Sequence, residues 1–160
     1  MKDKYILTVD PGVSIGWALW KPGTKLPLRT GIAPATVSRE GSYQTRSLAA
    51  VSYLQHALTY DWRCIGLVWI EWPQFFGFNA TAARGDLVKL AFSVGCLARM
   101  IDAFGGIRIH FVKVHEWKGQ LSKATIQRRI RKILGDGVCK EFKDDIWDAV
   151  GIGLWTRNLL

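Results

Sequence analysis

The sequence has few cysteines and no long hydrophobic run. Cys64, Cys96 and Cys139 are widely scattered over 160 residues, an odd number without the spacing of a disulfide framework or a zinc site. We therefore expect reduced, packed thiols in a cytoplasmic protein. No apolar run approaches the roughly 18–20 residues that a membrane span requires. No signal peptide precedes the first strand pattern, so we expect no membrane association.

Acidic residues are also scarce relative to basic ones, with 13 Asp and Glu against 22 Lys and Arg and a net charge of +9. This excess favours a polyanionic partner, and nucleic acid is the first candidate. The glycine-rich turns lack the Gly-x-x-x-x-Gly-Lys pattern of a P-loop, which argues against nucleotide hydrolysis of that type. The three histidines have no spacing that indicates zinc or a hydrolase triad.

A continuous apolar stretch near the N-terminus, residues 5–9, predicts a buried central strand. Asp10 follows this stretch directly and precedes a Pro-Gly turn, at which the strand must end. A carboxylate at the end of an interior strand is costly unless a cation meets it. The alternative is an ordinary turn-initiating aspartate.

Periodicity predicts the remaining elements, with strands before alternating helices and strands. The order indicates one mixed five-stranded sheet with helices on both faces, an α/β fold. The length favours a single domain, residues 1–160. The further strands are expected at residues 15–20, 26–37, 65–71 and 107–112, and the helices at residues 42–60, around 87–101, 122–134 and 144–157.

Four acids have the pattern of a metal site. Asp10 and Glu71 each end a buried strand, and Asp145 and Asp148 share one face of an apolar helix. Oxygen ligands suit Mg²⁺ or Mn²⁺. Alternatively, the two aspartates only meet the helix macrodipole in its first turn, and Glu71 only marks a strand leaving the core.

A second charged feature is the helix of residues 122–134, which Ser122 is expected to cap. Its outer face favours phosphate contacts with nucleic acid, although a solvated surface is the alternative. The cations between residues 123 and 132, with no acid among them, are Lys123, Arg128, Arg129, Arg131 and Lys132.

These motifs together resemble the RuvC-type Holliday-junction resolvases of the RNase H-like nuclease and integrase superfamily. The resemblance is carried by Val-Asp-Pro-Gly followed by Ile-Gly-Trp-Ala, by Trp-Ile-Glu, and by Asp-Asp-Ile-Trp-Asp-Ala-Val. It spans nearly the whole chain and fits a divergent, phage-type member. It implies an RNase H-like fold and a homodimer that cuts four-way junctions. The cuts would leave 5′-phosphate and 3′-hydroxyl ends. The four acids would hold two Mg²⁺ or Mn²⁺ ions per site.

The resemblance extends to lysines and aromatic residues. Lys113 and Lys123 fall where the family keeps functional lysines, and Phe75 and Phe76 fall where an aromatic residue probes the junction. The segment around Lys118 has no clear family counterpart, and we expect this lysine to contact a phosphate.

Three other classes of protein compete with this interpretation. One is another RNase H-like enzyme, either an RNA–DNA hybrid nuclease or a strand-transfer enzyme. The second is an actin-like ATP-binding protein, for which 160 residues are too few. The third is a DNA-binding module without catalysis, which the complete set of acids argues against.

Overall fold

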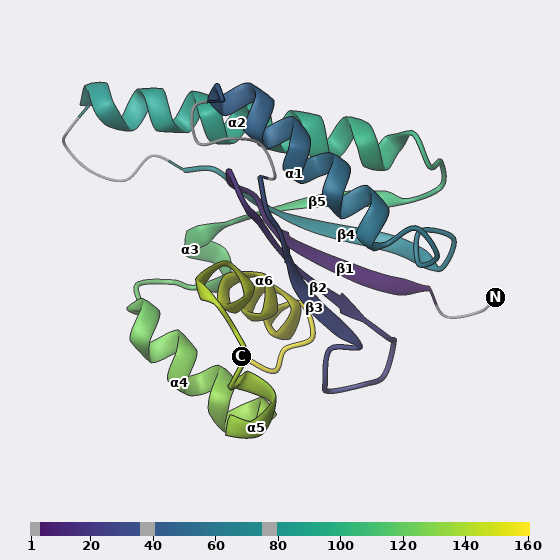
Figure 1. Cartoon of the computed structure of the whole chain (residues 1–160). Helices are drawn as coiled ribbons and strands as arrows, with labels where there is room; N and C mark the ends of the chain where they lie inside the picture. The colour runs from purple at the N-terminus through teal and green to yellow at the C-terminus, as the bar shows by residue number, and fades with distance from the viewer. Residues whose placement is uncertain (1–3, 36–40, 75–79) are drawn as a thin grey trace.

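A five-stranded mixed sheet runs through the centre of the molecule (Figure 1). The computed structural model describes residues 4–35, 41–74 and 80–160. The strand order is β3-β2-β1-β4-β5, with antiparallel pairing among the first three strands of the chain and parallel pairing of β1 with β4 and of β4 with β5. The predicted mixed sheet is confirmed. Its strands are β1 (Tyr5–Asp10), β2 (Ile15–Trp20), β3 (Arg29–Ala33), β4 (Ile65–Trp72) and β5 (Arg108–Lys113).

Helices cover both faces of the sheet, as predicted. In Figure 1, α1 (Tyr43–Ala57) and α2 (Ala80–Asp102) lie on one face and α6 (Asp144–Trp155) lies on the other. Beside α6 are three more helices, α3 (Val114–Trp117), α4 (Lys123–Leu134) and α5 (Asp136–Cys139). The sheet therefore separates two hydrophobic cores.

The alternation of side chains along β1 decides which residues face α6. Leu7 and Val9 are fully buried in the core under α1 and α2. Thr8 points the other way, and its hydroxyl donates to the carbonyl of Ala149 in α6 at 2.7 Å. Because strand side chains alternate with a period of two, Asp10 lies on the same face as Thr8.

Several predicted boundaries were wrong. The third strand, predicted at residues 26–37, is confined to Arg29–Ala33 within the described residues. Pro27 and Pro34 flank it and cannot donate to a sheet ladder. Residues 36–40 are outside the described part of the chain. The second long helix begins at Ala80, earlier than its predicted start near residue 87, and its first turns extend beyond the sheet in Figure 1.

The two shortest helices, α3 and α5, were not predicted, because four residues are too few to show a helical period. Within α1, Leu48 is 52% exposed, whereas Val51 and Leu54 are buried. It lies at the edge of the helix, beside an open groove.

The expectation of packed thiols holds for Cys139, which is buried. It is wrong for Cys64, which is exposed in the turn before β4. No helix of the described residues has the length and apolar character needed to cross a membrane.

Candidate active site

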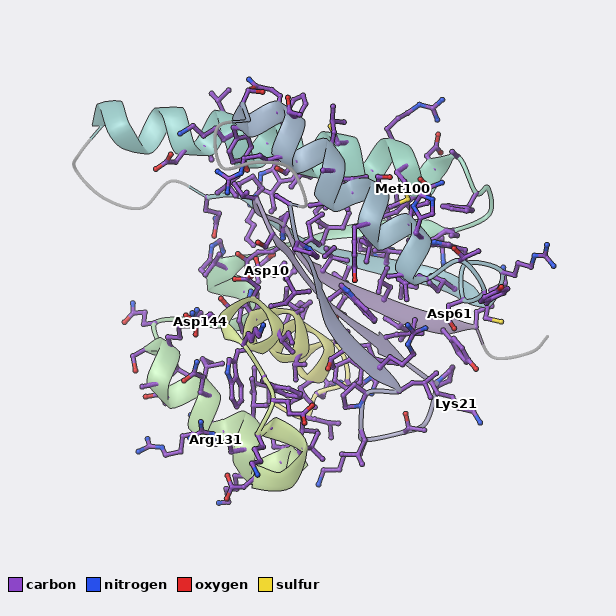
Figure 2. All side chains as sticks on the ribbon, viewed as in Figure 1. Asp10, Lys21, Asp61, Met100, Arg131 and Asp144 are labelled. Atoms are coloured by element: carbon purple, nitrogen blue, oxygen red, sulfur yellow. The ribbon has the colours of Figure 1, made fainter. Side chains whose placement is uncertain are left out.

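Asp10 is the first of the four acids along the chain, and it is half-buried. It ends β1, and Figure 2 shows it on the side of the sheet where α3 and α6 lie. Burial raises its pKa well above the ordinary value, and the negative charges of Glu71, Asp148 and Asp145 raise it further. The ammonium of Lys118 partly opposes this rise in the pKa. The carboxyl group of Asp10 is therefore surrounded by more negative than positive charge.

The pairing of β1 with β4 brings Glu71 beside Asp10. The two strands are parallel and adjacent, and Val9 is in register with Ile70, so the next residue of each strand is an acid at the same edge of the sheet. Burial raises the pKa of Glu71 to about 7, and the charge of Asp148 acts in the same direction. A hydrogen bond from Trp117 and the charge of Lys118 oppose the rise.

The first turns of α6 supply Asp145 and Asp148. This helix comes close to β2 because Gly16 has no side chain, and a Cβ atom there would collide with the backbone of Asp145. Burial raises the pKa of Asp145, Lys123 lowers it, and Asp144 and Asp148 raise it. The structure thus brings together all four acids that the sequence singled out.

The lysines occupy three different positions. Lys118 lies within the acidic cluster, only 16% exposed, with its Nζ 3.5 Å from Asp148 Oδ1. Lys123 is at the start of α4 and pairs with Asp144 at 3.5 Å. Lys113 is exposed at the end of β5, where its backbone N–H donates to Glu116 Oε2 at 2.6 Å. Lys118, expected only as a phosphate contact, is therefore the lysine placed among the carboxylates.

The donors fit a divalent cation by their chemistry. Four carboxylates supply only oxygen ligands, which is the preference of Mg²⁺ and Mn²⁺. The ammonium groups of Lys118 and Lys123 do not balance four carboxylate charges. Across residues 4–35, 41–74 and 80–160, however, no three His, Cys, Asp or Glu side chains already converge as a metal site. Trp117 donates to one oxygen of Glu71 and Lys118 to one oxygen of Asp148. A carboxylate has two oxygens, so each of these acids still has a second oxygen that can bind an ion.

The predicted DNA-contacting residues are distributed differently. The basic face of α4 is exposed, and Arg131 also lies over the Trp147 ring, 5.2 Å from its centroid. Ser122 caps this helix as predicted, accepting a hydrogen bond from the N–H of Thr125. Phe75 and Phe76 are outside the described residues. The other exposed cations of α4 are Lys123, Arg128, Arg129 and Lys132.

Trp117 was missed from the sequence. Its indole N–H donates to Glu71 Oε2 at 3.0 Å, and the side chain is 4% exposed. Neither its spacing nor its neighbours in the sequence link it to Glu71, which is 46 residues away. Only the three-dimensional arrangement of β4 and α3 reveals the contact.

Comparison with solved structures places this fold beside two resolvases. T. thermophilus RuvC in complex with a Holliday junction substrate superposes with a TM-score of 0.70 and 18% identity, over 95% of this chain and 91% of that one. The yeast mitochondrial Holliday junction resolvase Ydc2 superposes with a TM-score of 0.57 and 10% identity, over 98% of this chain and 82% of that one.

By sequence, no protein-family model and no curated protein matches this chain. The fold is thus the RNase H-like fold found in RuvC, and the resemblance first seen in the motifs is confirmed at the level of the fold.

Proposed function

We propose that residues 1–160 form one nuclease domain that cleaves four-way or other branched DNA by metal-dependent phosphodiester hydrolysis, leaving 5′-phosphate and 3′-hydroxyl ends. The observation that carries the proposal is the gathering of four carboxylates from β1, β4 and α6 at one edge of the sheet. They do so in a fold that two junction resolvases share. The setting is the cytoplasm of a bacterium or phage host, where such DNA occurs.

In this proposal Asp10, Glu71, Asp145 and Asp148 hold two Mg²⁺ or Mn²⁺ ions. Bound there, the ions supply an activated water and stabilise negative charge on the leaving oxygen. The raised pKa of Glu71, about 7, means that this carboxyl must lose its proton for tight binding near neutral pH.

The other charged side chains of the site act on the phosphate. The ammonium of Lys118 already lies between acids of β4 and α6. It would also pair with the phosphate of a bound substrate. Lys123 and Lys113 add positive charge outside the group of four acids. Each would stabilise the negative charge that develops on the reacting phosphate. Arg128, Arg129, Arg131 and Lys132 continue this positive surface along α4 toward the flanking phosphates.

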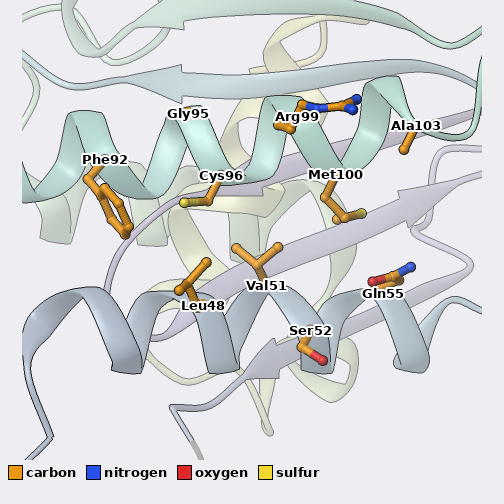
Figure 3. A pocket seen from close by; sticks show the side chains of 10 residues that line it. All are labelled: Leu48, Val51, Ser52, Gln55, Phe92, Gly95, Cys96, Arg99, Met100 and Ala103. Carbon is orange, nitrogen blue, oxygen red and sulfur yellow. The ribbon is translucent and has the colours of Figure 1, made fainter.

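A four-way junction has two-fold symmetry, so the proposal includes a homodimer with one site for each of two opposed strands. The groove between α1 and α2 favours this assembly. It measures about 710 Å³ and is mainly apolar, with Leu48, Val51, Phe92 and Met100 among its lining residues (Figure 3).

The test compares synthetic four-way, flap, duplex and RNA–DNA hybrid substrates, each with Mg²⁺ and with excess chelator. We expect the four-way junction to be cut at least about tenfold faster than duplex or hybrid, equivalent to 1.4 kcal/mol of discrimination. Chelator should abolish cleavage. Preference for the hybrid would instead indicate an RNA–DNA hybrid nuclease, and binding without any cleavage would indicate a non-catalytic DNA-binding module.

A further inference from the structure

Trp117 connects two elements that carry the acids of the site. Its indole N–H donates to Glu71 Oε2 at 3.0 Å, across the space between α3 and the end of β4. A hydrogen bond to an ionised carboxylate is stronger than one between neutral groups. At 4% exposure, this bond is largely shielded from competing water.

The same ring packs against α6. Gly151 is one turn beyond Asp148, and a Cβ atom at residue 151 would lie 2.5 Å from Cζ3 of Trp117. The indole therefore fills the space where any other residue would place a side chain. Trp117 therefore contacts both the strand that carries Glu71 and the helix that carries Asp145 and Asp148.

The neighbouring residues extend this connection. Lys118 pairs with Asp148 at 3.5 Å, and the backbone N–H of His115 donates to the side-chain Oε1 of Gln74, in the segment after β4, at 3.4 Å. The short helix α3 is consequently held to both the β4 end and α6 by its own side chains.

We propose that Trp117 is a positioning residue, which holds the Glu71 carboxylate in the orientation that lets it bind a divalent cation together with the acids of α6. The inference rests on the proposed function, because it gives Glu71 a role in holding metal. It assigns to Trp117 no contact with substrate. Side chains that orient metal ligands typically change metal affinity or activity by about 10–100-fold when they are replaced.

The test is Trp117→Phe, which keeps an aromatic ring but removes the N–H donor. The matched control is Trp62→Phe, because Trp62 is equally buried at 4% and donates its indole N–H to the carbonyl of Gln55 at 2.9 Å, in the opposite core. The readout is Mn²⁺ binding to the metal-free, DNA-free full chain, measured by calorimetry, with junction cleavage measured separately.

We expect Trp117→Phe to weaken Mn²⁺ binding about tenfold and Trp62→Phe to change it less than about twofold. In a Glu71→Ala background, adding Trp117→Phe should cost less than about twofold more, because the group that Trp117 orients is absent. Equal Mn²⁺ affinities for the two Trp→Phe variants would overturn the positioning role and leave the proposed nuclease function standing. Failure of the wild type to bind Mn²⁺ would overturn both.

A second measurement keeps the inference testable if Trp117→Phe does not fold. The eight tryptophans give separate indole N–H signals in nitrogen–proton NMR spectra, and proximity to Gly151 identifies that of Trp117. Glu71→Ala should move this signal upfield and leave that of Trp62 in place. An unmoved Trp117 signal would contradict the contact.

Discussion

At the scale of single residues, the candidate site has more acidic than basic side chains, and they are partly buried. Burial is the first cause of the raised pKa values of Asp10, Glu71 and Asp145, and neighbouring carboxylates add to it. Lys118 is the cation that opposes the rise for both strand acids. Such an arrangement costs folding free energy in the absence of a bound cation, and a divalent ion would offset this cost.

This charge balance predicts how the stability of metal-free protein depends on pH. A carboxyl whose pKa rises from 4.5 to about 7 on folding binds more protons in the folded state, so its favourable contribution is complete below pH 4.5 and is lost as the pH rises through 7. In chelator we therefore expect thermal stability to fall between pH 5 and 8, by up to about 3 kcal/mol from Glu71. Asp10 acts in the same direction.

Thermal melts of wild type and Glu71→Gln in chelator across this range test the expectation. The variant should show a shallower decline, because its neutral amide does not titrate. Added Mg²⁺ should restore wild-type stability at pH 8. Stability that rises with pH in the wild type would contradict the charge balance.

Sequence reasoning identified the four acids because each ends an apolar strand or lies on an apolar helix. Those local patterns do not depend on distant contacts. It did not place Lys118 among the acids or find Trp117, because both positions depend on α3, a single helical turn without a periodic pattern. The roles of Phe75 and Phe76 stay predictions.

At the scale of elements, the two faces of α4 differ in burial and charge. Ile126, Ile130 and Leu134 are buried against α6 and its neighbours, while the arginines of the opposite face are exposed. This division was predictable, because charged and apolar residues alternate with a helical period. The boundaries of β3 and α2 were less predictable. Prolines limit β3, and α2 begins before the part of the helix that packs on the sheet and shows an apolar pattern.

The exposed face of α4 yields a prediction about DNA affinity. Replacing Arg128 and Arg129 with glutamine should weaken junction binding and reduce the slope of log affinity against log salt by about 1.8, at roughly 0.9 per lost phosphate contact. Fluorescence anisotropy with Ca²⁺ across a salt series measures this slope.

The control replaces Lys21 and Lys25 with glutamine. It removes the same charge from the exposed β2–β3 connection, where Figure 2 labels Lys21 well away from Arg131. If both double variants lose equal slope, net charge rather than the α4 face determines binding.

At the scale of the whole molecule, the two faces of the sheet differ in the chemistry of the surfaces beside them. The face toward α6 carries the acids, and the face toward α1 and α2 ends in an apolar groove open to solvent. Exposed apolar patches of this kind mark interaction surfaces. A homodimer through this groove would keep both acidic sites away from the contact.

The groove gives a prediction about assembly. If the chain forms the proposed homodimer, Leu48→Glu should convert it to a monomer, because the substitution places a charge in the apolar contact. The control is Leu28→Glu, since Leu28 is similarly exposed, 48% against 52%, and precedes β3 rather than lining the groove. Light scattering coupled to size exclusion measures both. A wild-type monomer with junction present, or a Leu48→Glu dimer, would show that the groove is not the interface.

The central claim is that the four carboxylates form the catalytic metal site, and junction cleavage by single amide variants tests it most directly. With Mg²⁺ and a synthetic four-way junction, Asp10→Asn, Glu71→Gln, Asp145→Asn and Asp148→Asn should each lower the cleavage rate by at least about 100-fold, or 2.7 kcal/mol. Junction affinity should stay within about threefold of wild type, because phosphate contacts dominate binding. Near wild-type cleavage by any one variant would remove that acid from the site, and near wild-type cleavage by all four would contradict the account.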